Sequence, residues 1–248
     1  MLDLKINNLE AINAFVPRVV KWSSVDLLKE INSQHVTATP ELRNRIKHDL
    51  WGDMCAENDA ENLWKHLTSL DIDFTSSFKA VLKDWREDER NHYIGLRQIC
   101  SSVYHIAEEI IEKEMHERQP DFTHLQPFLE DEFKICVVLA YDELVSARGY
   151  NMFFEDFKQL GPRPFAQWVK WAARDEALHY QNFLDVIKLH HYSHLNKTEE
   201  VINEIYDYEN QKDYVYNATF LLDHTEETFT RDFLNECGKT VLQALTKT

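Results

Sequence analysis

The chain has 248 residues, 44% of them hydrophobic, and a formal net charge of -16. Its 5 glycines and 6 prolines are too few for the many turns of a sheet-rich fold. The acidic balance argues against binding nucleic acid phosphates, and no apolar stretch is long enough to span a bilayer. The 4 cysteines are scattered, which argues against a disulfide framework or zinc ribbon. With no N-terminal signal pattern visible, we expect a cytoplasmic protein.

Helical patterns follow one another along the first part of the chain. A helical region is expected over about residues 8–30, followed by a polar stretch. Thr39 as a cap and Pro40 in the first turn predict the start of a second helix, which runs over about 41–70. Asp and Thr residues over 71–75 then predict a break.

Three further long helices are expected over about 76–117, 129–160 and 165–191. The first two are separated by a proline-containing loop, and the last two by Gly161-Pro-Arg-Pro164. C-terminal helices are expected over about 198–248. The sequence therefore predicts one all-α domain over residues 1–248, with a core bundle of four helices and additional flanking helices.

One pattern of glutamate and histidine occurs twice in these helices. Its first copy is Glu57 with Glu89-x-x-His92, in which the two glutamates are 32 positions apart, and its second copy is Glu143 with Glu176-x-x-His179, in which they are 33 apart. A spacing of three residues places both side chains on one helix face. Four carboxylates and two imidazoles, distributed in this way, form the ligand set of a carboxylate-bridged di-iron or di-manganese centre in a four-helix bundle.

The surroundings of these acids favour the metal interpretation. Glu89, Glu143 and Glu176 each stand in the middle of an apolar stripe, where an ionised carboxylate is expensive unless it is paired or bound to metal. Glu57 is less clear from the pattern, because Glu61 shares its helix face.

A single Glu-x-x-His is weak support, because a chain with 12 histidines and many glutamates contains it by chance. The combination is more specific, since both copies lie mid-helix and each is preceded by an aspartate, Asp88 or Asp175. The alternative without metal is a buried ion-pair network, in which Arg174 or lysines neutralise the acids.

Several segments also carry a family resemblance: Gly52-Asp-Met-Cys-Ala-Glu57 with Leu67-Thr-Ser-Leu-Asp71, Trp85-Arg-Glu-Asp-Glu-Arg-Asn-His92, Tyr141-Asp-Glu143-Leu-Val-Ser146, Ala173-Arg-Asp-Glu176-Ala-Leu-His179, and Val20-Lys-Trp22. They resemble the GDM-x-x-E…LNTLD, W-x-x-E-E-N-R-H, F-Q-E-R-A-T, A-D-E-K-R-H and V-E-K-C-W segments of the soluble acyl-carrier-protein desaturases. The resemblance covers about residues 15–190 and selects Glu57 over Glu61.

The resemblance implies a ferritin-like four-helix bundle, with its core over about 41–191, that binds two iron ions; manganese would suit the same ligands. The implied ligands are Glu57, Glu89, His92, Glu143, Glu176 and His179. Asp175 would orient a ligand histidine, and Trp22 matches a family tryptophan implicated in electron transfer. Ser146 stands where the family usually has a threonine near the oxygen site, so that its hydroxyl is a candidate for proton delivery. A homodimer is also implied.

The expected activity is an O2-dependent oxidation. In the desaturase interpretation, ferredoxin or a reductase supplies electrons and a double bond is introduced into a fatty acyl chain on acyl carrier protein. The alternative is a di-iron hydroxylase or N-oxygenase of a small biosynthetic substrate, which the acidity and the short C-terminus favour. Iron storage, peroxide scavenging and a radical-generating ribonucleotide reductase subunit rank lower.

Overall fold

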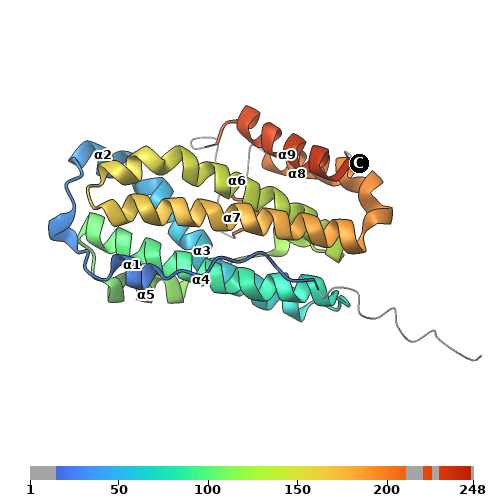
Figure 1. Ribbon diagram of the computed structural model, residues 1–248, viewed down its shortest axis with the longest axis horizontal. Coiled ribbons are helices and arrows are strands. Elements are labelled where there is room, and N and C mark those ends of the chain that lie inside the picture. Colours follow the sequence, from blue (N-terminus) through green and yellow to red (C-terminus); the bar gives the residue numbers. More distant parts are fainter. Residues whose placement is uncertain (1–14, 211–219, 225–228, 247–248) are drawn as a thin grey trace, which may run out of the picture.

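The computed structural model describes residues 15–210, 220–224 and 229–246, and within these ranges every regular element is a helix (Figure 1). In chain order the elements are α1 (Ser24–Leu28), η1 (Ser33–His35), α2 (Pro40–Arg45), α3 (Lys47–Ser69), α4 (Ser76–Tyr104), α5 (Glu108–Glu117), η2 (Thr123–Phe128), α6 (Glu132–Gln159), α7 (Arg163–His190), η3 (Tyr192–Lys197), α8 (Thr198–Glu209) and α9 (Arg231–Thr246). The prediction of an all-α helical bundle is confirmed.

Four long helices, α3, α4, α6 and α7, make up the bundle. Helices α6 and α7 lie side by side along their length, α3 packs against α4, and α4 also contacts α7 (Figure 1). The connection from α6 to α7 is short because Gly161 takes a backbone conformation with φ 116°, which side chains with a Cβ rarely adopt. Pro162 then stands at the N-cap position of α7. Such a short connection makes α6 and α7 antiparallel neighbours.

Two of the predicted helices are interrupted. The helix expected over 41–70 is divided at Ile46 into α2 and α3. The helix expected over 76–117 ends at Tyr104, where His105 takes a left-handed backbone with φ 58°, and the chain becomes helical again at Glu108. A left-handed residue ends a helix by turning the chain away from its axis. The helical periodicity continues across both breaks, so the pattern alone did not reveal them.

The prediction of an N-terminal helix over 8–30 is wrong for most of the residues in this range that the structure describes. Residues 8–14 lie outside the described residues, residues 15–23 are not helical, and α1 is only 5 residues long. Figure 1 shows the segment 15–23 running along the bundle beside α4 and α7.

Two asparagines hold this N-terminal segment on the bundle. Asn182 of α7 accepts a hydrogen bond from the backbone N of Arg18 (2.8 Å) and donates one to its carbonyl oxygen (3.0 Å). Asn91 of α4 accepts from the backbone N of Ser24 (2.7 Å). These bonds satisfy backbone groups that a helix would otherwise pair, and they carry Trp22 to the side of the bundle.

The other predicted boundaries agree with the structure. The Thr39 side chain accepts from the backbone N of Leu42 (3.2 Å), with Pro40 in the first turn of α2. Helices α8 and α9, which pack on each other and against α6, confirm the predicted C-terminal helices in the described part of 198–248. Among the described helices, none is both long enough and apolar enough to cross a bilayer.

The apolar core consists of two clusters, one toward each end of the bundle. On α4, Trp85 belongs to the first cluster and Leu96 to the second; on α7, Tyr180 belongs to the first and Ala173 to the second. The residues between these positions include the Glu-x-x-His of each helix. A layer of buried polar side chains therefore crosses the middle of the bundle.

Candidate metal centre

The polar layer contains all six predicted ligands, and each bundle helix contributes to it. Helix α3 supplies one glutamate, α6 supplies another, and α4 and α7 each supply a glutamate and a histidine. All of them are at least nine-tenths buried, with exposed fractions of 6% for Glu57, 1% for Glu89, 0% for His92, 1% for Glu143, 2% for Glu176 and 3% for His179.

These side chains form two groups, and each could hold a metal ion. The first group is Glu57, Glu89, His92 and Glu176, and the second is Glu89, Glu143, Glu176 and His179; within each group, one ligand atom per residue lies within 4.8 Å of the others. Glu89 and Glu176 belong to both groups. Two ions held in this way would share these two carboxylates, with one further glutamate and one histidine for each ion.

The histidines present Nδ1 to the acids. The Nδ1 atom of His92 lies 3.2 Å from Glu176 Oε1, 3.4 Å from Glu89 Oε2 and 3.6 Å from Glu57 Oε1. The Nδ1 atom of His179 lies 3.0 Å from Glu143 Oε2 and 3.1 Å from both Glu89 Oε1 and Glu176 Oε2. Nδ1 is therefore the ring nitrogen that would bind metal at both histidines.

The opposite nitrogen of each histidine faces an aspartate. Asp175 Oδ2 lies 3.4 Å from Nε2 of His92, and Asp88 Oδ2 lies 3.4 Å from Nε2 of His179. A carboxylate on the far nitrogen sets the tautomer and the orientation of a metal-binding imidazole. This role was predicted for Asp175 but not for Asp88, although the aspartate before each Glu-x-x-His was the available signal.

The predicted electron-transfer residue lies on the same side of the centre as Asp175. The Trp22 indole donates to Asp175 Oδ2, and its ring centroid is 6.0 Å from that of His92. Arg174 donates to the other oxygen, Oδ1 (3.0 Å). Asp88 instead has Lys21 as its cation, with Nζ 3.4 Å from Oδ1. The aspartates of the two motif copies thus have different partners on their outer side.

Two aromatic side chains hold the glutamates that belong to only one group. Trp85 Nε1 donates to Glu143 Oε1 and the Tyr150 hydroxyl donates to Glu57 Oε1, both at 2.7 Å. These two hydrogen bonds were not predicted from the sequence. Trp85 lies one turn before Glu89, and this spacing was the only signal.

Glu61 does not belong to the candidate metal centre. Its carboxylate binds Arg86, with 2.8 Å between Nη2 and Oε1, while Glu57 one turn earlier points into the polar layer. Arg174 pairs with Asp175 instead of with a ligand glutamate. Within the described ranges, no lysine or arginine forms an ion pair with any of the four glutamates. The described contacts therefore lack the arginine and lysine partners on which the alternative without metal depends.

The electrostatics of the cluster fit a site for cations. Both carboxylate oxygens of Glu89, Oε2 of Glu57 and Nδ1 of His92 are buried without a hydrogen-bond partner in the described structure. Burial, with the charges of Glu176 and Glu57, raises the pKa of Glu89 well above its ordinary value, and burial does the same for the pKa of Glu143. Oxygen and imidazole donors of this kind suit iron or manganese, and two divalent ions would offset the charge of the four carboxylates.

The imidazoles partly neutralise the acids. Burial alone would lower the pKa of His92, but the charges of Glu176 and Glu57 outweigh it and raise that pKa well above its ordinary value. The pKa of His179 is raised in the same way, mainly by Glu143. Burial would raise the pKa of Glu176, yet the neighbouring imidazoles, His92 first, hold it below its usual range. Glu176 is thus favoured in its ionised form.

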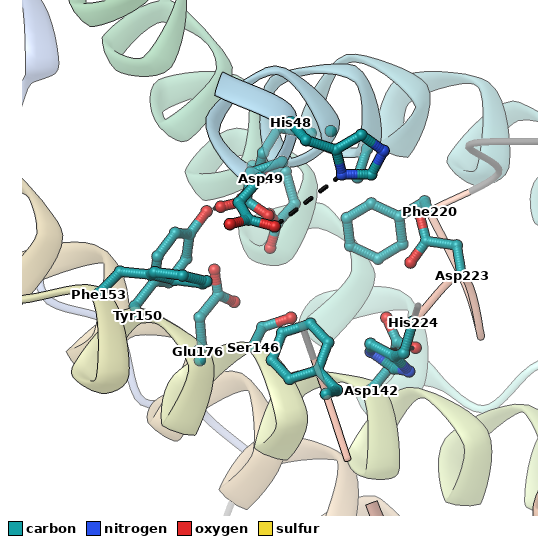
Figure 2. A pocket seen from close by; sticks show the side chains of 17 residues that line it. His48, Asp49, Asp142, Ser146, Tyr150, Phe153, Glu176, Phe220, Asp223 and His224 are labelled. Atoms are coloured by element: carbon teal, nitrogen blue, oxygen red, sulfur yellow. Dashed lines mark hydrogen bonds and ion pairs between the residues drawn. The ribbon is translucent and has the colours of Figure 1, made fainter. Parts of the chain in front are cut away.

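A pocket opens beside the centre, between α3, α6 and the segment 220–224 (Figure 2). Its volume is about 80 Å³, and three candidate ligands, Glu57, Glu89 and Glu176, form part of its wall. The other described residues that line it are His48, Asp49, Gly52, Asp53, Ala56, Asp142, Ser146, Gly149, Tyr150, Phe153, Phe220, Asp223, His224 and Phe229. Ser146, the candidate for proton delivery, therefore lies on the wall of this pocket.

Comparison of the chain with protein-family models, with curated proteins and with solved structures finds no match. The functional assignment therefore depends on the arrangement of the residues themselves.

Proposed function

We propose that the chain is a non-haem di-iron oxidoreductase that uses O2 to oxidise a small polar substrate bound in the pocket of Figure 2. The observation that carries the proposal is the pair of groups that share Glu89 and Glu176. A buried set of four carboxylates and two histidines on four helices is the arrangement of carboxylate-bridged di-metal proteins. Bound iron would supply the activation of dioxygen, a chemistry that side chains alone lack.

The chain's own residues have distinct tasks in this proposal. Asp88 and Asp175 hold the imidazoles with Nδ1 toward the metals. Trp85 and Tyr150 fix one oxygen of Glu143 and Glu57, which leaves the second oxygen for a metal. The two apolar clusters above and below the polar layer keep bulk water away from it.

Protons and electrons would reach the centre by different routes. Ser146 lies on the pocket wall, where its hydroxyl can pass a proton to a bound substrate. Trp22 contacts both Asp175 and His92 from the outer side, which favours it as the path for electrons from ferredoxin or a reductase. These external donors, like the homodimer and the acyl carrier protein, stay predictions.

The pocket favours the small-molecule alternative over a fatty acyl substrate. An acyl chain needs a long wall of apolar side chains, whereas the described lining carries carboxylates and histidines beside its aromatic rings. The small volume, about 80 Å³, also supports a compact substrate. A hydroxylation or N-oxygenation of such a molecule is the activity that these features support best.

Metal analysis and oxygen consumption test the proposal. We expect the purified protein to bind about two Fe²⁺ per chain and to consume O2 when it is reduced. Glu89→Ala and Glu176→Ala should each abolish both properties, because each removes a ligand of both groups. Glu61→Gln is the matched control, one turn from Glu57 but bound to Arg86, and it should retain both. A wild-type protein that cannot be loaded with metal would refute the proposal.

A further inference from the structure

A buried histidine on the pocket wall has no part in the candidate metal centre. His224 lines the pocket beside Asp142 (Figure 2), and its side chain is only 6% exposed. The backbone N of Leu222, two residues earlier, donates to Asp142 Oδ1 (2.9 Å). Phe220 and Leu222 both have left-handed backbones, with φ 76° and 52°, which residues other than glycine rarely adopt. Such a conformation persists only where the surrounding structure enforces it, so the position of His224 is firmly set.

The two ring nitrogens of His224 have different surroundings. Nδ1 lies 2.6 Å from Oε1 of Glu209, at the end of α8, and the Glu209 side chain is 3% exposed. Nε2 has no hydrogen bond in the described structure, because Asp142 Oδ1 lies 3.8 Å away, beyond hydrogen-bond length. A carboxylate on one nitrogen fixes the tautomer and the orientation of the ring. Nε2 is therefore the nitrogen that is available to a molecule in the pocket.

Acidic neighbours keep this imidazole protonated. Burial alone would lower the pKa of His224, but the charge of Glu209, followed by those of Asp142 and Asp223, raises that pKa to about 9. Near neutral pH, Nε2 therefore carries a proton that a base in the pocket can accept. Apart from the candidate ligands, the titratable groups that contact the imidazole or share its pocket are Tyr141, Asp142 and Tyr150 from α6, Glu209 from α8, Asp223 from its own segment, and His48, Asp49 and Asp53 from α3.

A second buried pair of histidine and glutamate, which we call the comparison pair, shows what a purely structural role requires. His191 Nε2 lies 2.9 Å from Oε1 of Glu132, and the same carboxylate accepts from the Thr75 hydroxyl (2.7 Å). These contacts join the ends of α4, α6 and α7, and neither member belongs to the described lining of the pocket. His224 differs because its second nitrogen faces a cavity whose wall includes three candidate ligands.

We propose that His224, held by Glu209, is the catalytic acid that supplies protons to the oxygen chemistry in the pocket. The inference rests on the proposed function, in which a substrate RH, O2, two electrons and two protons give ROH and water. The electrons come from the external ferredoxin or reductase. One proton leaves Nε2 for the oxygen atom that departs as water, while Nδ1–H stays hydrogen-bonded to the Glu209 carboxylate. The neutral imidazole regains its proton from water between turnovers, and Ser146, which also lines the pocket, can relay it.

The protonation of His224 can be measured without any turnover. Histidine side-chain ¹⁵N–¹H spectra are recorded on protein loaded with Zn²⁺, which is diamagnetic and accepts the same carboxylate and imidazole ligands. Nδ1 should keep its proton while Nε2 titrates with a pKa of about 9. Glu209→Gln should lower this pKa toward the ordinary histidine value of about 6.5, because the adjacent negative charge is lost. A pKa that is unchanged in Glu209→Gln would overturn the inference.

Oxygen uptake by the Fe²⁺-loaded protein, with ascorbate as the electron donor, tests the role itself. O2 takes up two protons when it becomes hydrogen peroxide and four when it becomes water, so either product needs the acid. The wild-type rate should fall as the pH rises through the pKa of His224, because only the imidazolium donates. His224→Gln should lower the rate at neutral pH by about 100-fold and remove this fall. Glu209→Gln should move the fall to lower pH.

Controls separate proton supply from a structural role. His191→Gln breaks the comparison pair and should leave the rate and its pH profile unchanged. Added imidazole should restore part of the rate of His224→Ala, which it would not do if the histidine only fastened the fold. Metal content and melting temperature are measured first on each sample. A wild-type protein that binds no iron refutes the proposed function, and this inference with it, whereas a His224→Gln protein that binds iron normally and keeps the wild-type rate and pH profile overturns the inference alone.

Discussion

Asp88 Oδ2 lies 3.4 Å from Nε2 of His179, a residue 91 positions later in the chain that belongs to the other copy of the repeated motif. Asp175 and His92 form the reciprocal pair at the same distance. Each Asp-Glu-x-x-His therefore supplies the support for the histidine of its counterpart. Each histidine thus depends on an aspartate of the other copy, and the relative register of α4 and α7 sets the alignment of both imidazoles.

Loss of either supporting aspartate should weaken metal binding. We expect Asp88→Asn and Asp175→Asn each to lower the affinity for Fe²⁺ by about 10–100-fold, because an amide holds the imidazole less strongly than a carboxylate does. Competition with a chromogenic chelator measures the affinity. Asp185→Asn, on the same helix as Asp175 but paired with Arg18 at the surface, should bind metal normally. Unchanged affinity in both Asp88 and Asp175 variants would contradict the assignment.

Metal loading should stabilise the fold. At free metal about 100 times the dissociation constant, a ligand that binds only the native state adds about 2.7 kcal/mol to the free energy of unfolding. Chelation should therefore lower the melting temperature of the wild-type protein. A Glu89→Ala/Glu176→Ala double variant serves as the reference, since its melting temperature should respond to neither metal nor chelator. The same response in both proteins would show that the ions bind elsewhere.

Gly95 should not accept a side chain. A Cβ at this position in α4 would overlap the indole of Trp168 and meet the hydroxyl of Ser24, which itself accepts from Trp168 Nε1 (2.9 Å). Overpacking of this kind costs about 1–3 kcal/mol, so Gly95→Ala should lower the urea midpoint. Arg90→Ala, on the exposed side of the same helix, should change stability by less than about 0.5 kcal/mol. A Gly95→Ala variant as stable as the wild type would show that Trp168 can move aside.

Removal of one partner from the ion pair between Asp59 and Arg118 should strongly destabilise the fold. Asp59 is 0% exposed, and Arg118 binds its Oδ2 through Nη2 (2.5 Å) and Nε (3.2 Å). Arg118→Ala would leave a buried carboxylate without its cation, at a cost of about 3–5 kcal/mol. The double variant Asp59→Asn/Arg118→Ala should recover part of this loss in chemical denaturation. A single variant that loses less than about 1 kcal/mol would place the pair among ordinary surface contacts.

The thiols should be unreactive in the native protein. All four cysteines are buried, and burial raises the pKa of Cys100 and Cys136 well above the ordinary value. Because the thiolate is the reactive form, a chromogenic disulfide reagent at neutral pH should modify the folded chain slowly and the unfolded chain at once. Rapid reaction of a thiol under native conditions would indicate local opening of the core.

The sequence pattern predicted what depends on local spacing. The helical class, the cap at Thr39 and the two Glu-x-x-His pairs are encoded in intervals of three or four residues, whereas Glu57 was chosen over Glu61 through the family resemblance. The contacts of Trp85 and Tyr150 with candidate ligand glutamates were missed, because a pattern does not tell which side chain of a neighbouring helix an aromatic donor will meet. The break at His105 was missed for a related reason, since a left-handed residue other than glycine leaves no mark in the apolar periodicity. The pocket depends on the segment 220–224, whose position no local rule predicts.

The division of the core by its polar layer has a consequence for how the protein assembles. Each end of the bundle buries its own apolar side chains, while the layer between them gathers buried carboxylates with partnerless oxygens. In the absence of metal, the buried carboxylates would oppose close packing of the helices at this layer. Bound ions would relieve this opposition and couple the two apolar halves, so that both ends of the bundle unfold together as one cooperative unit.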